Sequence, residues 1–118
     1  YVRPKPKDHG TGSQIEGILP EGAKVVIIED LISTGMSSLA AKNALVNAGA
    51  DVKGMVAIFS YNFNKARKAF EDDNVELTTL SNYDTLVEVA HEIGYIKESD
   101  IEVLKEWRFS PSTWGKNE

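Results

Sequence analysis

Two neighbouring acids, Glu29 and Asp30, stand between an apolar run and a short stretch rich in small hydroxyl residues. Carboxylates accept hydrogen bonds from sugar hydroxyl groups and hold Mg²⁺ through water molecules. The stretch that follows, residues 33–37, supplies hydroxyl donors and a glycine that lets a ligand approach the backbone. An apolar helical pattern begins at Met36, so the stretch is also a helix start, which favours bound anions. The pattern predicts a site for a phosphorylated sugar.

A simpler interpretation of the same residues is a solvated strand end followed by a helix. In that case Ser33 or Thr34 would be the N-cap of the helix. Solvation and capping can explain single residues between 29 and 37, but they explain the complete run less well.

A second candidate motif is the basic segment at the start of the chain. Residues 1–13 hold a cluster of basic side chains in a protein whose net charge is −5: Arg3, Lys5, Lys7 and His9. Prolines and glycines in the same segment favour an extended, mobile loop. Such a loop could close over an anion, whereas the alternative is a solvated terminal cluster of charges.

An α/β framework is needed to position these two motifs. The β-branched run at residues 25–28 predicts a strand that is buried on both faces, as in a parallel sheet covered by helices. Ligands bind beyond the carboxyl ends of such strands, where Glu29 and Asp30 follow. Further apolar patterns predict strands at 52–61 and 75–80 and helices at 36–48 and 64–72. Two more helices are predicted to begin at Ser81 or Asn82 and at Ser99 or Asp100.

The run at residues 29–37 resembles the phosphoribosyl-pyrophosphate (PRPP) signature of type I phosphoribosyltransferases. That signature consists of an apolar strand, two adjacent acids, two apolar residues and a loop of small hydroxyl residues and glycine. The basic segment resembles the flexible catalytic loop of the orotate phosphoribosyltransferase family, at a similar distance before the acids, through Arg3, Lys7, His9 and Gly10. The resemblance covers most of the chain. It implies a Rossmann-like α/β core with a parallel sheet, in which residues 1–118 form one domain that lacks its N-terminal portion, that is, a carboxyl-terminal half.

The same resemblance implies the chemistry and the roles of individual residues. The expected reaction transfers the phosphoribosyl group of PRPP to orotate, which gives orotidine 5'-phosphate and pyrophosphate. Lys7, His9 and Asp30 are the expected catalytic residues, Ser33 also lies near orotate, and Mg²⁺ is the expected cofactor without a direct protein ligand. A homodimer is expected, with the loop at residues 1–13 reaching the partner's site. The expected PRPP contacts are Arg3, Lys7, His9, Glu29, Asp30, Leu31, Ile32, Ser33, Thr34, Gly35, Met36 and Ser37.

Two positions depart from the family pattern. Pro4 stands where many relatives have a lysine, and Lys5 follows one place later. Residues 60–63 stand where some relatives place an arginine that contacts the carboxylate of the base. Two alternatives stay open: a phosphoribosyltransferase for another base, and a non-catalytic sensor that keeps the nucleotide pocket. A receiver-type signalling domain also has acids at a strand end, but it needs an Asp at the end of another strand and a Lys at the end of a later one, and residues 60–61 and 81–82 supply neither.

Composition narrows the class of protein further. The acidic balance, with a pI near 5.0, argues against a nucleic-acid-binding surface, which needs clustered Lys and Arg. There is no cysteine, so disulfides are absent, and no apolar run approaches the length of a membrane span. We expect a protein of the cytoplasm that binds neither nucleic acid nor membrane.

Overall fold

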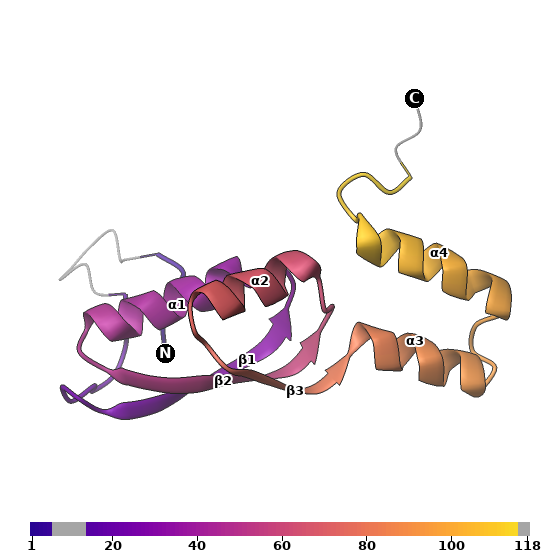
Figure 1. Cartoon of the computed structure of the whole chain (residues 1–118). Coiled ribbons are helices and arrows are strands. Elements are labelled where there is room, and N and C mark those ends of the chain that lie inside the picture. The colour runs from indigo at the N-terminus through magenta and orange to yellow at the C-terminus, as the bar shows by residue number, and fades with distance from the viewer. Residues whose placement is uncertain (6–13, 116–118) are drawn as a thin grey trace.

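The structure is a computed structural model and describes residues 1–5 and 14–115. A three-stranded parallel sheet forms its centre (Figure 1). The strands β1 (Lys24–Ile32), β2 (Asp51–Ser60) and β3 (Leu77–Asn82) lie in the order of the sequence. The crossover helices α1 (Met36–Asn47) and α2 (Asn64–Asp72) lie side by side on one face of the sheet. Each new strand adds to the same edge, so crossovers of one hand place both helices on the same side.

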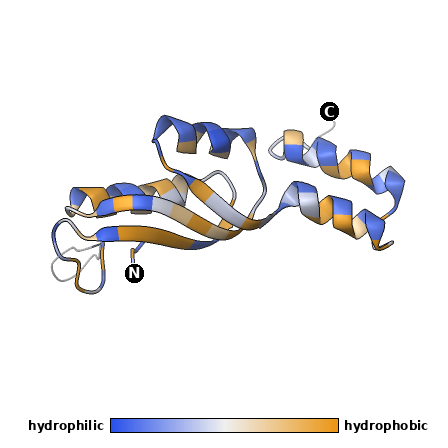
Figure 2. Cartoon of the chain, turned by 60° about the horizontal axis from the view of Figure 1, so that its bottom comes forward, coloured by the Kyte–Doolittle hydropathy of each residue, from blue (hydrophilic) through white to orange (hydrophobic). Residues whose placement is uncertain are grey.

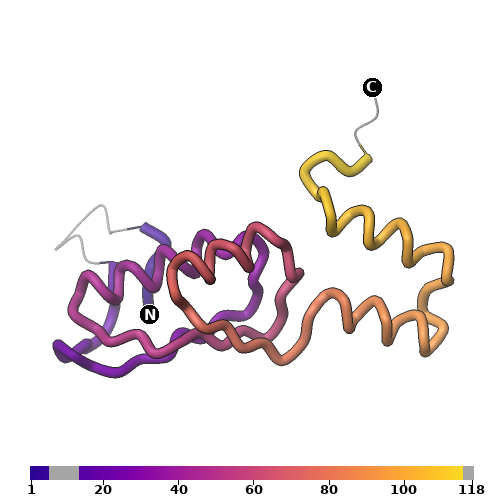
Figure 3. The backbone as a smooth tube through the Cα atoms, viewed as in Figure 1, coloured from indigo at the N-terminus to yellow at the C-terminus, as the bar shows by residue number. Residues whose placement is uncertain are grey.

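The last two helices form a hairpin beyond the carboxyl end of β3. They are α3 (Tyr83–Glu92) and α4 (Glu98–Phe109), and the tube in Figure 3 shows them projecting from the sheet. This hairpin gives the molecule an elongated shape, with extents of 53 × 33 × 25 Å. Over the two described ranges, no helix combines the length and the apolar character that crossing a membrane requires.

The core lies between the sheet and its two covering helices. Met55 and Ala57 of β2 are fully buried there against Leu39 of α1 and Phe70 of α2. The opposite face of the sheet is open, and Figure 2 shows hydrophobic residues along its strands. The exposed fractions on that face are 53% for Val26, 73% for Ile28, 57% for Ile58 and 76% for Leu80. The prediction that residues 25–28 are buried on both faces is therefore wrong, because helices cover only one face.

Most of the predicted elements are present, and the differences lie at their ends. The helix at 64–72 has the predicted bounds, and Asn82 caps α3 by accepting a hydrogen bond of 2.9 Å from the Thr85 N–H. β1 is longer than predicted, since its pairing with β2 continues to Ile32. The third strand starts and ends two residues later than predicted. As a result, Glu29 and Asp30 lie inside β1 rather than beyond its end.

Candidate functional site

The acid pair lies in the last part of β1, at the edge of the sheet. Glu29 is in register with Ala57 of β2 and is half-buried, whereas Asp30 is exposed. Neighbouring residues of a strand point to opposite faces. Both acids nevertheless line one hollow of about 520 Å³, which wraps around this edge and is also lined by Val2 and Glu16. The two carboxylates can therefore reach a ligand that lies across the edge of β1.

The predicted helix start follows directly and has the expected form. α1 begins at Met36, and Gly35 is its N-cap, with a left-handed φ of +82°. The Gly35 carbonyl accepts the first helical hydrogen bond, of 2.9 Å, from the Leu39 N–H. Ser33 and Ser37 are exposed and Thr34 is half-buried. We call residues 33–37 the phosphate turn, because the free amides of the first helical turn and these hydroxyls suit a dianion.

Capping by a hydroxyl residue does not explain the phosphate turn. The only cap-like contact of Thr34 that the structure gives is a long one, 3.4 Å from its Oγ1 to the Met36 N–H. The N-cap position itself belongs to Gly35, which has no side chain to fill it. The interpretation of Ser33 or Thr34 as the N-cap is therefore wrong, and the hydroxyls of the phosphate turn are available to a ligand.

The basic segment is described only at its base. The Arg3 N–H donates to the Gln14 carbonyl over 2.7 Å, and the Gln14 side chain donates back to the Arg3 carbonyl over 2.9 Å. The Arg3 guanidinium forms an ion pair with Glu16, a residue of the same hollow that Glu29 and Asp30 line. The predicted contacts Lys7 and His9 lie outside the described residues. The structure thus brings the base of the loop next to the acids.

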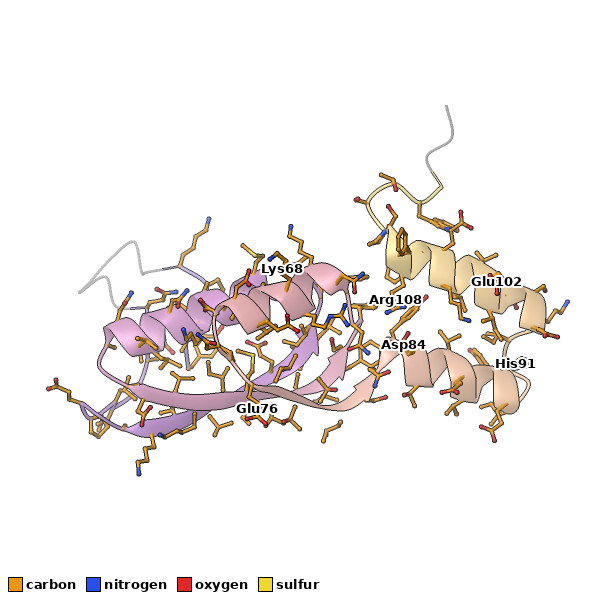
Figure 4. The ribbon with its side chains drawn as sticks, in the orientation of Figure 1. Lys68, Glu76, Asp84, His91, Glu102 and Arg108 are labelled. Atoms are coloured by element: carbon orange, nitrogen blue, oxygen red, sulfur yellow. The ribbon has the colours of Figure 1, made fainter. Side chains whose placement is uncertain are left out.

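The loop between β2 and α2 was not predicted to be a site, and its backbone is unusual. Asn62 has a left-handed φ of +57°, which is uncommon for a residue other than glycine. Its carbonyl accepts a hydrogen bond of 3.3 Å from Arg108 of α4, and its side chain donates to Asp84 of α3. Arg108 and Asp84 also form an ion pair with each other at 3.4 Å, and both residues are labelled in Figure 4. No sequence pattern could have indicated this network, because its members come from three separate elements.

An aromatic side chain of the same region has a perturbed acidity. Burial raises the pKa of Tyr83 above its ordinary value, the Asp84 carboxylate and Tyr61 raise it further, and the Arg108 guanidinium opposes them. The Tyr83 hydroxyl donates a hydrogen bond of 2.9 Å to the Leu104 carbonyl of α4. Tyr83 therefore holds the two helices of the hairpin together as a neutral phenol. The second histidine, His91, lies at the far end of α3 (Figure 4).

The carboxylates fit a site in which Mg²⁺ is shared with a ligand. Within residues 1–5 and 14–115, no group of three or more His, Cys, Asp or Glu side chains is placed to hold a metal ion. Glu29 and Asp30 supply hard carboxylate oxygens, which can hold Mg²⁺ through the water molecules bound to the ion. The six positions of the ion itself would be taken by water and by the oxygens of a phosphorylated ligand.

Comparison with known proteins identifies relatives over nearly the whole chain, although no family model matches it. The orotate phosphoribosyltransferase of Listeria innocua is 55% identical over 116 residues, which are 98% of this chain and 56% of that protein. The enzyme of the same name from Lactococcus lactis subsp. cremoris is 50% identical over 114 residues, or 97% of this chain and 54% of that protein. The chain thus spans about half the length of the curated relatives it matches.

Solved structures give the same picture of the fold. Orotate phosphoribosyltransferase from Aeropyrum pernix has a TM-score of 0.66 at 29% identity, over 82% of this chain and 52% of that one. UMP synthase from Leishmania donovani has a TM-score of 0.68 over 87% of this chain and 23% of that one, and its 24% identity supports the fold alone. The chain therefore has the α/β fold of the type I phosphoribosyltransferases and is similar, over nearly its whole length, to about half of an orotate phosphoribosyltransferase.

Proposed function

We propose that this chain is part of an orotate phosphoribosyltransferase and binds the ribose phosphate of PRPP. The observation that carries the proposal is the continuous unit of strand, acid pair and phosphate turn, which runs from β1 into α1. The 5'-phosphate would bind the amides and hydroxyls of the phosphate turn, and the ribose hydroxyls would donate to Glu29 and Asp30. The sequence identity of 55% to the orotate phosphoribosyltransferase of Listeria innocua supports the choice of orotate as the acceptor.

The basic loop would act on the leaving group. When the bond between C1 of the ribose and pyrophosphate breaks, negative charge grows on the pyrophosphate oxygens. Arg3, Lys7 and His9 are the chain's candidates to stabilise that charge, and Mg²⁺, when bound with PRPP, would neutralise part of it. In the structure the Arg3 guanidinium forms an ion pair with Glu16. To stabilise the pyrophosphate, Arg3 would have to leave Glu16 and pair with the pyrophosphate instead. Binding and loop closure would therefore be coupled.

Isothermal titration of PRPP with Mg²⁺ into the protein that carries this chain tests the ribose phosphate site. Asp30→Asn keeps the shape of the side chain and removes its charge, and we expect it to weaken binding by about tenfold, or 1.4 kcal/mol. The matched control is Glu76→Gln, which removes an exposed acid directly before β3, the strand at the opposite edge of the sheet from β1 (Figure 4). Equal affinities of all three proteins would overturn the proposed role of the acids.

An assay of product formation separates an enzyme from a sensor. We expect orotate and PRPP together to give orotidine 5'-phosphate and pyrophosphate, and Lys7→Ala to lower the turnover more than the affinity for PRPP. Release of pyrophosphate with adenine, guanine or xanthine in place of orotate would assign a different acceptor. Binding of PRPP without release of pyrophosphate under any of these conditions would assign a sensor.

We also infer a homodimer in the cytoplasm, with the basic loop acting in the partner's site. Mixing two impaired variants at a PRPP concentration that does not saturate Asp30→Asn tests this arrangement, because Lys7→Ala damages only the loop and Asp30→Asn only the pocket. If the loop acts in trans, a mixed dimer contains one site in which both parts are intact, and activity returns on mixing. If the loop acts within its own subunit, the mixture stays as inactive as its components.

A further inference from the structure

The glycine of the phosphate turn rests on an aromatic ring from another element. A Cβ atom on Gly35 would lie 2.8 Å from Cε2 of Phe70, closer than real Cβ atoms approach another carbon. Gly35 is itself buried and has a φ of +82°, a conformation that costs other residues about 1 kcal/mol or more. The turn therefore needs glycine for two separate reasons, the backbone conformation and the space that the ring occupies.

The ring that meets Gly35 is firmly held. Phe70 lies on α2 and is only 4% exposed. It packs in the same core cluster as Leu39, which is in the first part of α1, and Ala66, which lies one turn before it on α2. Its backbone is fixed as well, because the Phe70 carbonyl accepts a hydrogen bond of 3.0 Å from the Val75 N–H. The ring is thus a rigid support beneath the N-cap residue of α1.

The direction of the first amides of α1 depends on that support. Gly35 is the N-cap of α1, and its carbonyl accepts from the Leu39 N–H, so a shift of Gly35 moves the whole first turn. An anion at a helix start is bound by N–H groups that must point at its oxygens. A displacement of the turn by a fraction of an ångström would lengthen several of these hydrogen bonds at once.

We propose that Phe70 is a positioning residue for the phosphate turn, and that its ring aims the amides of α1 at the 5'-phosphate. This inference depends on the proposed function, since it concerns the same phosphate. The proposed role of Phe70 is more than a contribution to the stability of the core. A change at Phe70 should lower the affinity for the phosphate end of the ligand, and a loss of stability alone does not explain such an effect. Ligands that lack a 5'-phosphate should be unaffected by a change at Phe70.

The test compares two substitutions in the core by titration of ribose 5-phosphate and of pyrophosphate. Phe70→Leu removes the support, whereas Met55→Ala opens a cavity in the middle of β2, where Met55 is 1% exposed. Both should lower the free energy of unfolding, and Met55→Ala should lower it more. We expect Phe70→Leu to weaken the binding of ribose 5-phosphate about tenfold, or 1.4 kcal/mol, and to leave that of pyrophosphate unchanged. Met55→Ala should change neither affinity by more than about twofold, or 0.4 kcal/mol.

A second pair of variants keeps the test decisive if Phe70→Leu folds poorly. Gly35→Ala alone suffers both the clash and the backbone strain. In Gly35→Ala combined with Phe70→Met, a large but flexible apolar side chain still supports the turn and can move aside for the new methyl group. We expect the double variant to bind ribose 5-phosphate more tightly than Gly35→Ala does. Equal losses in the Phe70 and Met55 variants, or no rescue in the double variant, would overturn the role of Phe70. Failure of the unsubstituted protein to bind ribose 5-phosphate would instead overturn the proposed function and this inference with it.

Discussion

The Asn62 side chain donates a hydrogen bond of 2.9 Å to Oδ2 of Asp84, and so ties the loop after β2 to the start of α3. Arg108 of α4 completes the link, since it lies 3.4 Å from the other oxygen of Asp84 and donates to the Asn62 carbonyl. A residue in a strained conformation is held in place by its surroundings, and here two helices from later in the chain hold Asn62. The helical hairpin therefore determines the shape of a loop at the carboxyl edge of the sheet.

Asp84→Ala should destabilise the protein by removing the centre of this link. Asp84 is half-exposed, so we expect a loss of about 1 kcal/mol, which corresponds to a decrease of about 4 °C in the melting temperature. Glu88→Ala, one turn further along α3, is the matched control because it removes an exposed acid from the same helix. Thermal unfolding followed by circular dichroism checks the difference, and equal melting temperatures of the two variants would contradict it.

Asn62→Gly distinguishes two contributions of Asn62 to stability, the strain of its backbone and the hydrogen bond of its side chain. Asn74 has a similar left-handed φ, +54° against +57° for Asn62, and gives a matched position. Glycine relieves the strain at either site but adds flexibility to the unfolded chain, so Asn74→Gly should change the stability little. Asn62→Gly also loses the bond to Asp84, and we expect it to be less stable than Asn74→Gly by about 1 kcal/mol. Urea unfolding measures both, and an equal effect would show that the bond contributes nothing.

Trp107 should contribute far more to stability than Trp114. The Trp107 ring packs at 5.6 Å from Tyr61, 5.7 Å from Phe63 and 5.4 Å from Tyr83, between ring centres. Trp114 is 45% exposed. We expect Trp107→Ala to cost about 3 kcal/mol and Trp114→Ala well under about 1 kcal/mol, measured by urea unfolding. Similar losses from both would mean that the cluster around Tyr61 is not what holds the hairpin to the sheet.

The sequence predicted those parts of the candidate site in which one short segment supplies the polar side chains and also the backbone that positions them. Residues 29–37 carry the acids, the turn and the start of α1 within a single stretch, so their pattern could be read directly. The link between Asn62 and Arg108 spans 46 residues and depends on how the hairpin folds back. β1 continues past its acids because backbone pairing with β2 does not depend on the polarity of side chains. Its apolar run gave no sign that one face would stay uncovered.

Tyr83 gives a prediction for the pH dependence of stability. Burial raises the pKa of Tyr83 in the folded state above its ordinary value of about 10. The folded chain therefore holds the phenol proton more tightly than the unfolded chain, and this stabilisation is complete below the unfolded pKa and lost as the pH rises through the folded pKa. Tyr83→Phe should cost about 1 kcal/mol near neutral pH, through the hydrogen bond to Leu104, and its deficit should shrink at alkaline pH. Tyr95→Phe, at a residue that is 84% exposed, is the control and should match the unsubstituted protein throughout. A deficit that stays constant from neutral to alkaline pH would contradict the assignment.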